Sequence, residues 1–307
     1  MQIKNLTLAL ITSSIWGSSF LMIKYSLDEL NPSDIAIYRI VIGAIFINIF
    51  VRTNEKIEKS DHIWMLIISF FWMALPFYMF GIAEQTITSS LAGLINGSTP
   101  IFVAFIAVVF YKLKVTRLQL IYIFSGFIGV GLITLGDGLN ELSFSIGSIY
   151  ALIASISYGI SVNLVEPLIK KYDSLIVIKI VMRYASLLSL LMFGFTATFK
   201  IPTLEVSLIP MMILGIGGTA IAFLSYYKLL NNVGRISSSF VVYMIPIFSI
   251  FFGYQFLNEI TNSIQFVGIG IILSSAFLYS RTQSIYCLLY TSPSPRDDIS
   301  SRMPSSA

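Results

Sequence analysis

The stretch Leu118–Leu135, LQLIYIFSGFIGVGLITL, contains no charged residue. An α-helix of about 20 apolar residues crosses the ~30 Å hydrocarbon core of a membrane. Apolar runs of about that length recur along the whole chain. Membrane β-strands would instead alternate polar and apolar residues over segments of about 10 residues. The sequence therefore predicts an all-α membrane protein.

Composition supports the same fold class and excludes several others. Of the 307 residues, 56% are hydrophobic and 11% are charged, whereas soluble domains carry about 25% charged residues. One cysteine, Cys287, excludes a disulfide framework, and one histidine, His62, argues against a histidine metal cluster. The formal charge of +4 is too small to indicate nucleic-acid binding. We expect no cofactor, no metal and no nucleic-acid partner.

Ten spans are predicted, joined by connections too short for a soluble domain. The first begins near the N-terminus, and it lacks the A-x-A cleavage site of a signal peptide. The predicted spans are 6–25, 35–51, 63–83, 89–110, 118–135, 146–165, 174–195, 207–227, 236–256 and 264–280.

The distribution of lysine and arginine predicts the orientation. If the N-terminus is cytoplasmic, the outer loops hold only Lys24 and Lys200, and every other basic residue near a span end lies inside. Cytoplasmic loops of membrane proteins are enriched in lysine and arginine. Both termini are therefore expected in the cytoplasm. The inner set is Lys4, Arg52, Lys56, Lys59, Lys112, Lys114, Arg117, Lys170, Lys171, Lys228, Arg235 and Arg281.

The two halves of the chain resemble each other. Trp16 aligns with Tyr158, and both follow an Ala-Leu-Ile triplet by the same distance. Each half has five spans, an odd number, so the second copy is predicted to insert upside down relative to the first. We predict one repeat over 1–138 and a second over 139–285. The tail, 286–307, is rich in serine and proline and is read as disordered or non-native sequence.

Several short motifs together carry a family resemblance. They are Trp16-Gly17-Ser18-Ser19-Phe20, Arg39, Ser89-Ser90-Leu91-Ala92 running to Pro100, Gly234 through Pro246, Gly253, Glu259, Thr261 and Gly268. Over about 1–281 the chain resembles the EamA-type family of the drug/metabolite transporter superfamily. Lys114 departs from the pattern, since members often have Glu there. The resemblance implies ten helices around a central cavity, and export of amino acids, other small metabolites or drugs.

Two arginines at membrane depth are candidates for substrate binding. Ionisable groups inside a membrane are costly and are functional candidates for that reason. Arg39 and its repeat partner Arg183 could each hold a carboxylate in a bidentate contact. The alternative is a snorkelling anchor or a pair with a backbone carbonyl.

Aromatic and small polar residues near the span centres complete the predicted cavity. Trp16 and Tyr158 lie too deep for an interfacial belt and suit either a cavity wall or ordinary packing. The remaining predicted cavity residues are Ser18, Ser19, Tyr78, Asn96, Ser161, Asn163, Tyr184 and Tyr243.

Energy coupling is less clearly marked in the sequence. No Asp or Glu falls in the middle of a predicted span, and Glu84 and Glu166 sit at span ends, where an interfacial place is favoured. Transport is therefore predicted to be facilitative or exchange-like, or else proton-coupled through one of these two residues.

The sequence favours a secondary transporter that works by alternating access in the bacterial inner (cell) membrane. A sugar or nucleotide-sugar exchanger or importer of the same superfamily is the nearest alternative. An intramembrane enzyme would need clustered catalytic groups, which the sequence does not show, so we predict that the chain is not an enzyme. The expected partners are a small-molecule substrate and the lipid bilayer, and a homodimer is left open.

Overall fold

A computed structural model of the chain describes residues 3–53, 55–112, 116–136, 145–238 and 240–291. All regular secondary structure in these ranges is helical. The elements are α1 (Ile3–Leu27), α2 (Pro32–Phe50), the short η1 (Lys59–Asp61), α3 (His62–Ser69), η2 (Phe70–Ala74), α4 (Leu75–Ala83), α5 (Ser89–Asn96), α6 (Thr99–Val109), α7 (Arg117–Gly136), α8 (Ile146–Lys171), α9 (Ser174–Phe193), α10 (Leu208–Met212), η3 (Ile213–Ile221), α11 (Ala222–Ser238), α12 (Phe240–Leu257) and α13 (Ser263–Thr291).

Seven helical segments in the described ranges are long and apolar enough to cross a membrane. They confirm an all-helical, multi-pass membrane protein. Three shorter apolar helices, Arg117–Ile133, Met244–Leu257 and Ser263–Tyr279, overlap the other predicted spans. The count of ten spans and the cytoplasmic termini stay predictions. The seven segments are Ile3–Leu27, Pro32–Phe50, Lys59–Ala83, Ser89–Val109, Ile146–Lys171, Ser174–Phe193 and Leu208–Leu229.

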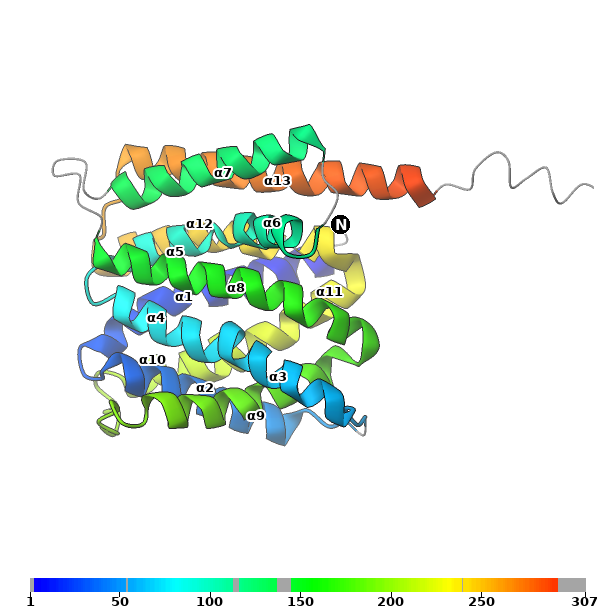
Figure 1. Cartoon of the computed structure of the whole chain (residues 1–307). Coiled ribbons are helices and arrows are strands. Elements are labelled where there is room, and N and C mark those ends of the chain that lie inside the picture. The colour runs from blue at the N-terminus through cyan, green and yellow to red at the C-terminus, as the bar shows by residue number, and fades with distance from the viewer. Residues whose placement is uncertain (1–2, 54, 113–115, 137–144, 239, 292–307) are drawn as a thin grey trace, which may run out of the picture.

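Two pairs of helices form opposite edges of the bundle (Figure 1). Helix α7 packs along α13 at one edge, and α2 packs along α9 at the other. In the predicted repeat, each of these pairs joins a helix to its counterpart in the other half. The remaining helices lie between the two edges, so the interior of the bundle is built from both halves.

The same helix cap occurs at the starts of α7 and α13. Gln119 Oε1 accepts from Thr116 N at 2.8 Å, and Gln119 N donates back to Thr116 Oγ1 at 3.2 Å. Gln265 Oε1 accepts from Asn262 N at 3.1 Å, and Gln265 N donates to Asn262 Oδ1 at 2.9 Å. Such reciprocal capping boxes satisfy N–H groups that a helix start leaves free.

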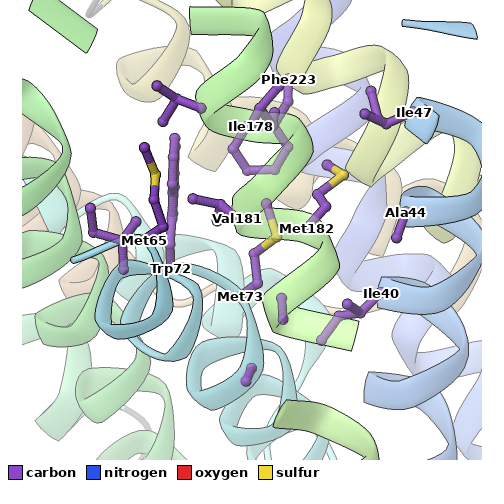
Figure 2. Close-up of a cluster of buried hydrophobic side chains, with 14 of the residues drawn as sticks. Ile40, Ala44, Ile47, Met65, Trp72, Met73, Ile178, Val181, Met182 and Phe223 are labelled. Carbon is purple, nitrogen blue, oxygen red and sulfur yellow. The ribbon is translucent and has the colours of Figure 1, made fainter. Parts of the chain in front are cut away.

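Large apolar side chains fill the space between α2, α3, η2, α9 and α11. Figure 2 shows this cluster at close range, and all of its labelled members are buried. Lipid tails are as apolar as these side chains, so close van der Waals packing, rather than escape from water, holds such helices together. The labelled residues are Ile40, Ala44, Ile47, Met65, Trp72, Met73, Ile178, Val181, Met182 and Phe223.

One end of the α2–α9 pair is tied by hydrogen bonds to two carboxylates. Asp34 accepts from Thr198 Oγ1 and from Phe199 N, the latter at 2.9 Å. Glu29 accepts from Ser207 Oγ and from Thr203 N. The two hydrogen bonds to Glu29 lower its pKa, the bond from Ser207 having the larger effect. They do so because they stabilise the charged carboxylate.

The other end of the pair is tied by lysines. Lys171 Nζ lies 2.8 Å from both Glu58 Oε2 and Asp61 Oδ2. Lys179 Nζ donates to Val51 O at 2.6 Å, just beyond the last turn of α2. At both ends of the α2–α9 pair, hydrogen bonds or ion pairs therefore join the first half of the chain to the second.

Two π-helical segments, η2 and η3, interrupt the third helical rod of each half. Each offers a carbonyl to a side chain of the opposite half: Ser157 Oγ donates to Phe71 O at 2.7 Å, and Trp16 Nε1 donates to Gly218 O at 3.1 Å. Polar side chains commonly satisfy backbone groups where membrane helices are irregular.

The α7–α13 contact gives a test of the packing. A Cβ on Gly129 would lie 2.7 Å from Gly268 O, whereas a Cβ on Gly131 would meet nothing within 4 Å. Gly129→Val should therefore destabilise the protein by about 1–3 kcal/mol, the usual cost of overpacking.

The matched control is Gly131→Val on the same helix, which should unfold at nearly the wild-type temperature. Thermal unfolding of both variants in detergent measures the difference, and equal melting temperatures for the two would contradict this packing.

Candidate functional site

A cavity of about 140 Å³ lies in the interior of the bundle, among helices of both halves. A larger groove of about 640 Å³ lies between α6, α7 and α8, but its lining is apolar except for Tyr111, and several of its residues are exposed at the surface. Of these two hollows in the described part of the chain, the interior cavity is the one whose lining includes a charged group and several polar groups. Its lining is Trp16, Ser19, Phe20, Ile23, Arg39, Trp72, Phe77, Phe80, Asn96, Thr99, Tyr158, Val162, Phe223, Tyr226, Val242 and Ile245.

Arg39 is the one charged side chain among these lining residues. It is 5% exposed, and its Nε donates to Thr219 Oγ1 at 3.1 Å. Its Cζ lies 3.8 Å from the centre of the Phe77 ring, a cation–π contact. These contacts orient the guanidinium without using its terminal nitrogens, which keep the fork geometry that binds carboxylates.

Close backbone packing brings Thr219 to Arg39. A Cβ on Gly215 would lie 2.6 Å from Ile42 Cβ, so only glycine lets η3 approach α2 this closely. A Cβ on Gly218 would lie 2.8 Å from Ser19 Oγ. Glycine at 218 therefore leaves room beside Arg39 and exposes the carbonyl that Trp16 binds.

A break between α5 and α6 supplies two further polar groups. Helix α5 ends at Asn96, and α6 begins at Thr99, followed by Pro100. Asn96 Oδ1 and Thr99 Oγ1 are buried and have no hydrogen-bond partner within the described part of the chain. Buried polar atoms are rarely left unpaired, so these two are candidates for contact with a ligand.

The rest of the wall is mainly aromatic. The Trp16 ring packs against Phe223 and Tyr226 at centroid distances of 5.3 and 5.4 Å. The Tyr158 ring stacks on Phe80 at 6.2 Å. The cavity thus presents one cation, two unpaired polar atoms and an aromatic surface.

Five of the residues predicted from the sequence lie in this lining: Trp16, Ser19, Arg39, Asn96 and Tyr158. Thr99, Thr219 and the aromatic residues of η2, α4 and α11 were not predicted from the sequence. Pro100 was a signal for the α5–α6 break, because proline favours the first turn of a helix. The missed aromatic residues are typical of any span and carried no signal.

Arg183 lies outside the cavity, unlike its repeat partner. It is exposed, and its Nε donates to Asn48 Oδ1 at 2.5 Å. Helix α9 forms an edge of the bundle, which removes Arg183 from the interior although its sequence position matches that of Arg39.

Two predicted tyrosines also lie elsewhere. Tyr78 stacks on Phe193 at a centroid distance of 4.2 Å. Tyr184 Oη lies 2.8 Å from His62 Nδ1. Neither contributes to the cavity lining. The side chain of Tyr243 lies outside the described residues.

Three small polar residues serve the helices instead of the cavity. Ser18 Oγ and Ser161 Oγ each donate to a carbonyl of their own helix at 2.9 Å. Asn163 Nδ2 donates to Val103 O at 3.1 Å and to Gly159 O at 2.9 Å, so it ties α8 to α6.

The two carboxylates considered for coupling lie in opposite environments. Glu166 is partly exposed and forms a 2.9 Å ion pair with Lys170. Glu84, at the end of α4, is fully buried within the protein, and neither of its oxygens has a hydrogen-bond partner among the described residues.

Glu259 joins the two halves at the start of α5. Its carboxylate accepts from the backbone N of Ser89 and of Ser90, both at 2.8 Å, and from their hydroxyls at 2.9 and 2.6 Å. A carboxylate at a helix N-terminus is favoured by the helix dipole. A Cβ on Gly253 would lie 2.3 Å from Glu259 Oε2, so glycine is needed for this contact.

Comparisons with known proteins agree on one family. The sequence profile of the EamA-like transporter family matches twice, over residues 3–135 and 145–281. An uncharacterized transporter of Archaeoglobus fulgidus is 25% identical, over 92% of this chain and 98% of its own length. The uncharacterized transporter YdfC of Bacillus subtilis is 23% identical over 83% of each chain.

Two further comparisons concern location and fold. The uncharacterized inner membrane transporter YedA of Escherichia coli is 23% identical over 86% of each chain. A solved crystal structure with 14% sequence identity superposes with a TM-score of 0.61, covering 92% of this chain and 99% of the other. The latter similarity supports the fold alone.

The Arg39–Thr219 contact can be tested by stability. Thr219→Val removes the acceptor of a buried charged donor, which should cost about 1–3 kcal/mol. Ser161→Ala removes a hydroxyl bonded only within its own helix and should cost less than about 1 kcal/mol. Thermal unfolding in detergent compares them, and a Thr219→Val variant as stable as Ser161→Ala would refute the contact.

Proposed function

Because this chain belongs to the EamA-like transporter family, we propose that it exports a small metabolite carrying a carboxylate, amino acids foremost, across the cell membrane. The observation that carries the proposal is the placement of Arg39 as the one cation among the described residues that line a largely aromatic interior cavity. The proposed site consists of Arg39, Asn96, Thr99, Trp16 and Tyr158.

Arg39 is proposed to bind the substrate carboxylate. The bond from its Nε to Thr219 and the contact with Phe77 hold the guanidinium plane in place. A planar guanidinium then offers two parallel N–H groups to a carboxylate. Little side-chain freedom is left to lose when the substrate binds, which favours affinity.

Asn96 Oδ1 and Thr99 Oγ1 are proposed to accept hydrogen bonds from the substrate amine. Both atoms are buried and lack partners in the described ranges, so an ammonium would satisfy them. The aromatic wall around Trp16 and Tyr158 would contact the remainder of the substrate, by stacking or by apolar packing.

The size and charge of the cavity favour this substrate class over a nucleotide sugar. Drug-sized ligands occupy pockets of about 300–1,000 Å³, whereas this cavity has a volume of about 140 Å³. A nucleotide sugar also carries phosphates, which need several cations. A sugar or nucleotide-sugar exchanger remains the alternative that a transport screen must include.

Transport is proposed to follow alternating access, with ten spans in two inverted halves and both termini in the cytoplasm. The two matches to one family profile support a repeated structure, and inverted repeats commonly enclose a substrate site near the membrane midplane. A location in the bacterial inner membrane is supported by the similarity to YedA.

A growth-rescue screen tests both the function and the site. Cells expressing the protein are challenged with toxic amino acids, analogues, drugs and sugar phosphates, and uptake into vesicles follows for each compound rescued. Arg39→Ala should weaken substrate affinity by roughly 10- to 100-fold, since a hydrogen bond to a charged group contributes about 1.5–3 kcal/mol. Arg39→Lys should restore only part of it, because lysine cannot make the bidentate contact.

Arg183→Ala is the matched control, because it removes the equivalent arginine of the other half, which lies outside the cavity. At equal expression it should rescue like wild type. Equal losses for both arginines, or rescue unaffected by Arg39→Ala, would contradict the proposed site. Rescue only from sugar phosphates would favour the alternative.

A further inference from the structure

Glu84 lies directly behind the cavity wall. Its backbone N donates to Phe80 O at 3.0 Å, one helical turn away, and Phe80 lines the cavity. The Glu84 side chain is 0% exposed, and neither carboxylate oxygen has a hydrogen-bond partner among the residues described. The Phe20 and Phe80 rings, both in the cavity lining, meet at 5.2 Å.

Three charged groups lie near enough to Glu84 to act on it electrostatically, each from a different element: Lys24 of α1, Arg39 of α2, and Glu259 after α12. Lys24 Nζ donates to the carbonyls of Glu84 and Ile87 at 2.6 and 3.1 Å. Arg39 is held by Thr219, and Glu259 adds a like charge. No ion pair to the Glu84 carboxylate occurs in the described part of the chain.

A bare carboxylate in this position would be unstable. Burying a carboxylate whose oxygens have neither a hydrogen bond nor an ion pair is strongly unfavourable even after the protein relaxes. A neutral carboxyl group avoids most of that penalty, because only a polar group is then buried. The closed arrangement therefore requires a proton on Glu84.

We propose that Glu84 is a proton-binding site whose occupancy holds the adjacent end of the cavity closed. When α1 and α4 separate at that end, water reaches the carboxyl and its proton passes from Oε to a water molecule. The resulting carboxylate stays hydrated, facing Lys24, and re-forms the closed state only after it takes up a proton. In the transport cycle proposed above, this step would link proton movement to substrate movement, but proton binding itself needs no substrate.

Cavity access at different pH values tests the switch. With Cys287 replaced by Ser, Ser19→Cys places a thiol in the cavity lining, where the native serine is 5% exposed. Its reaction with a water-soluble maleimide is followed in lipid nanodiscs as pH rises. When Glu84 is kept, the labelling rate, corrected for ionisation of the thiol itself, should rise by up to about tenfold per pH unit. This is the dependence expected when loss of one proton is linked to opening.

Glu84→Gln in the same background provides the reference, because a neutral amide mimics the protonated carboxyl. The labelling rate of the Glu84→Gln variant should follow the ionisation of the thiol alone. The control variant Glu166→Gln should show the same pH dependence as the protein that keeps both glutamates. Identical pH profiles with and without Glu84 would overturn the proposal.

Infrared spectroscopy gives a second readout that does not depend on opening. The carbonyl band of a protonated carboxyl should be present in the wild-type protein at neutral pH, absent in Glu84→Gln and shifted in Glu84→Asp. A wild-type spectrum without that band would refute the proposal even if Glu84→Gln failed to fold. Since neither experiment uses a substrate, failure of the carboxylate-export proposal would leave both results unaffected.

Discussion

The need to pair every polar group away from water shapes this structure more than any single apolar contact. The hydrocarbon core of a bilayer contains no hydrogen-bonding partners. Backbone groups left unpaired where a helix is irregular must therefore find partners inside the protein. Here the partners come from the opposite half: Trp16 binds a carbonyl of η3, Ser157 binds one of η2, and Glu259 binds the start of α5. The irregular segments therefore bind the halves together as well as interrupting the helices.

The irregular segments also decide where the polar atoms of the cavity are found. The approach of η3 to α2 brings Thr219 to Arg39, and the gap between α5 and α6 brings Asn96 and Thr99 to the cavity. A bundle of uninterrupted helices would bury these groups in helix contacts or leave them in lipid. Departures from regular helix therefore supply much of the polar chemistry of the interior.

Much of the fold follows from hydropathy, since long apolar runs predict helices wherever they occur. The breaks within those runs are harder to predict: between α5 and α6 the local signals are the short polar segment Asn96-Gly97-Ser98-Thr99 and Pro100, in a stretch that is otherwise long enough for one span. Arg39 was predicted as a cavity residue because a charged side chain inside the membrane is energetically unfavourable, and it lines the cavity. The same reasoning placed Arg183 there as well. Sequence equivalence does not reveal which helix forms the edge of the bundle, nor that the side chain of Glu84 at the end of α4 is fully buried.

The two edge pairs have a bearing on how such a chain arises. In each pair, α2 with α9 and α7 with α13, a helix packs against the helix that is its counterpart in the predicted repeat. A helix meets its own copy in this way at a two-fold axis, as in the isologous interface of a homodimer. In a dimer of identical half-length chains, each residue would occupy two places in the assembly, and the same side chain would have to suit both. Joining two copies in one gene would lift that requirement, and the arginines at equivalent places of the predicted repeat differ in this way: Arg39 is buried and Arg183 is exposed.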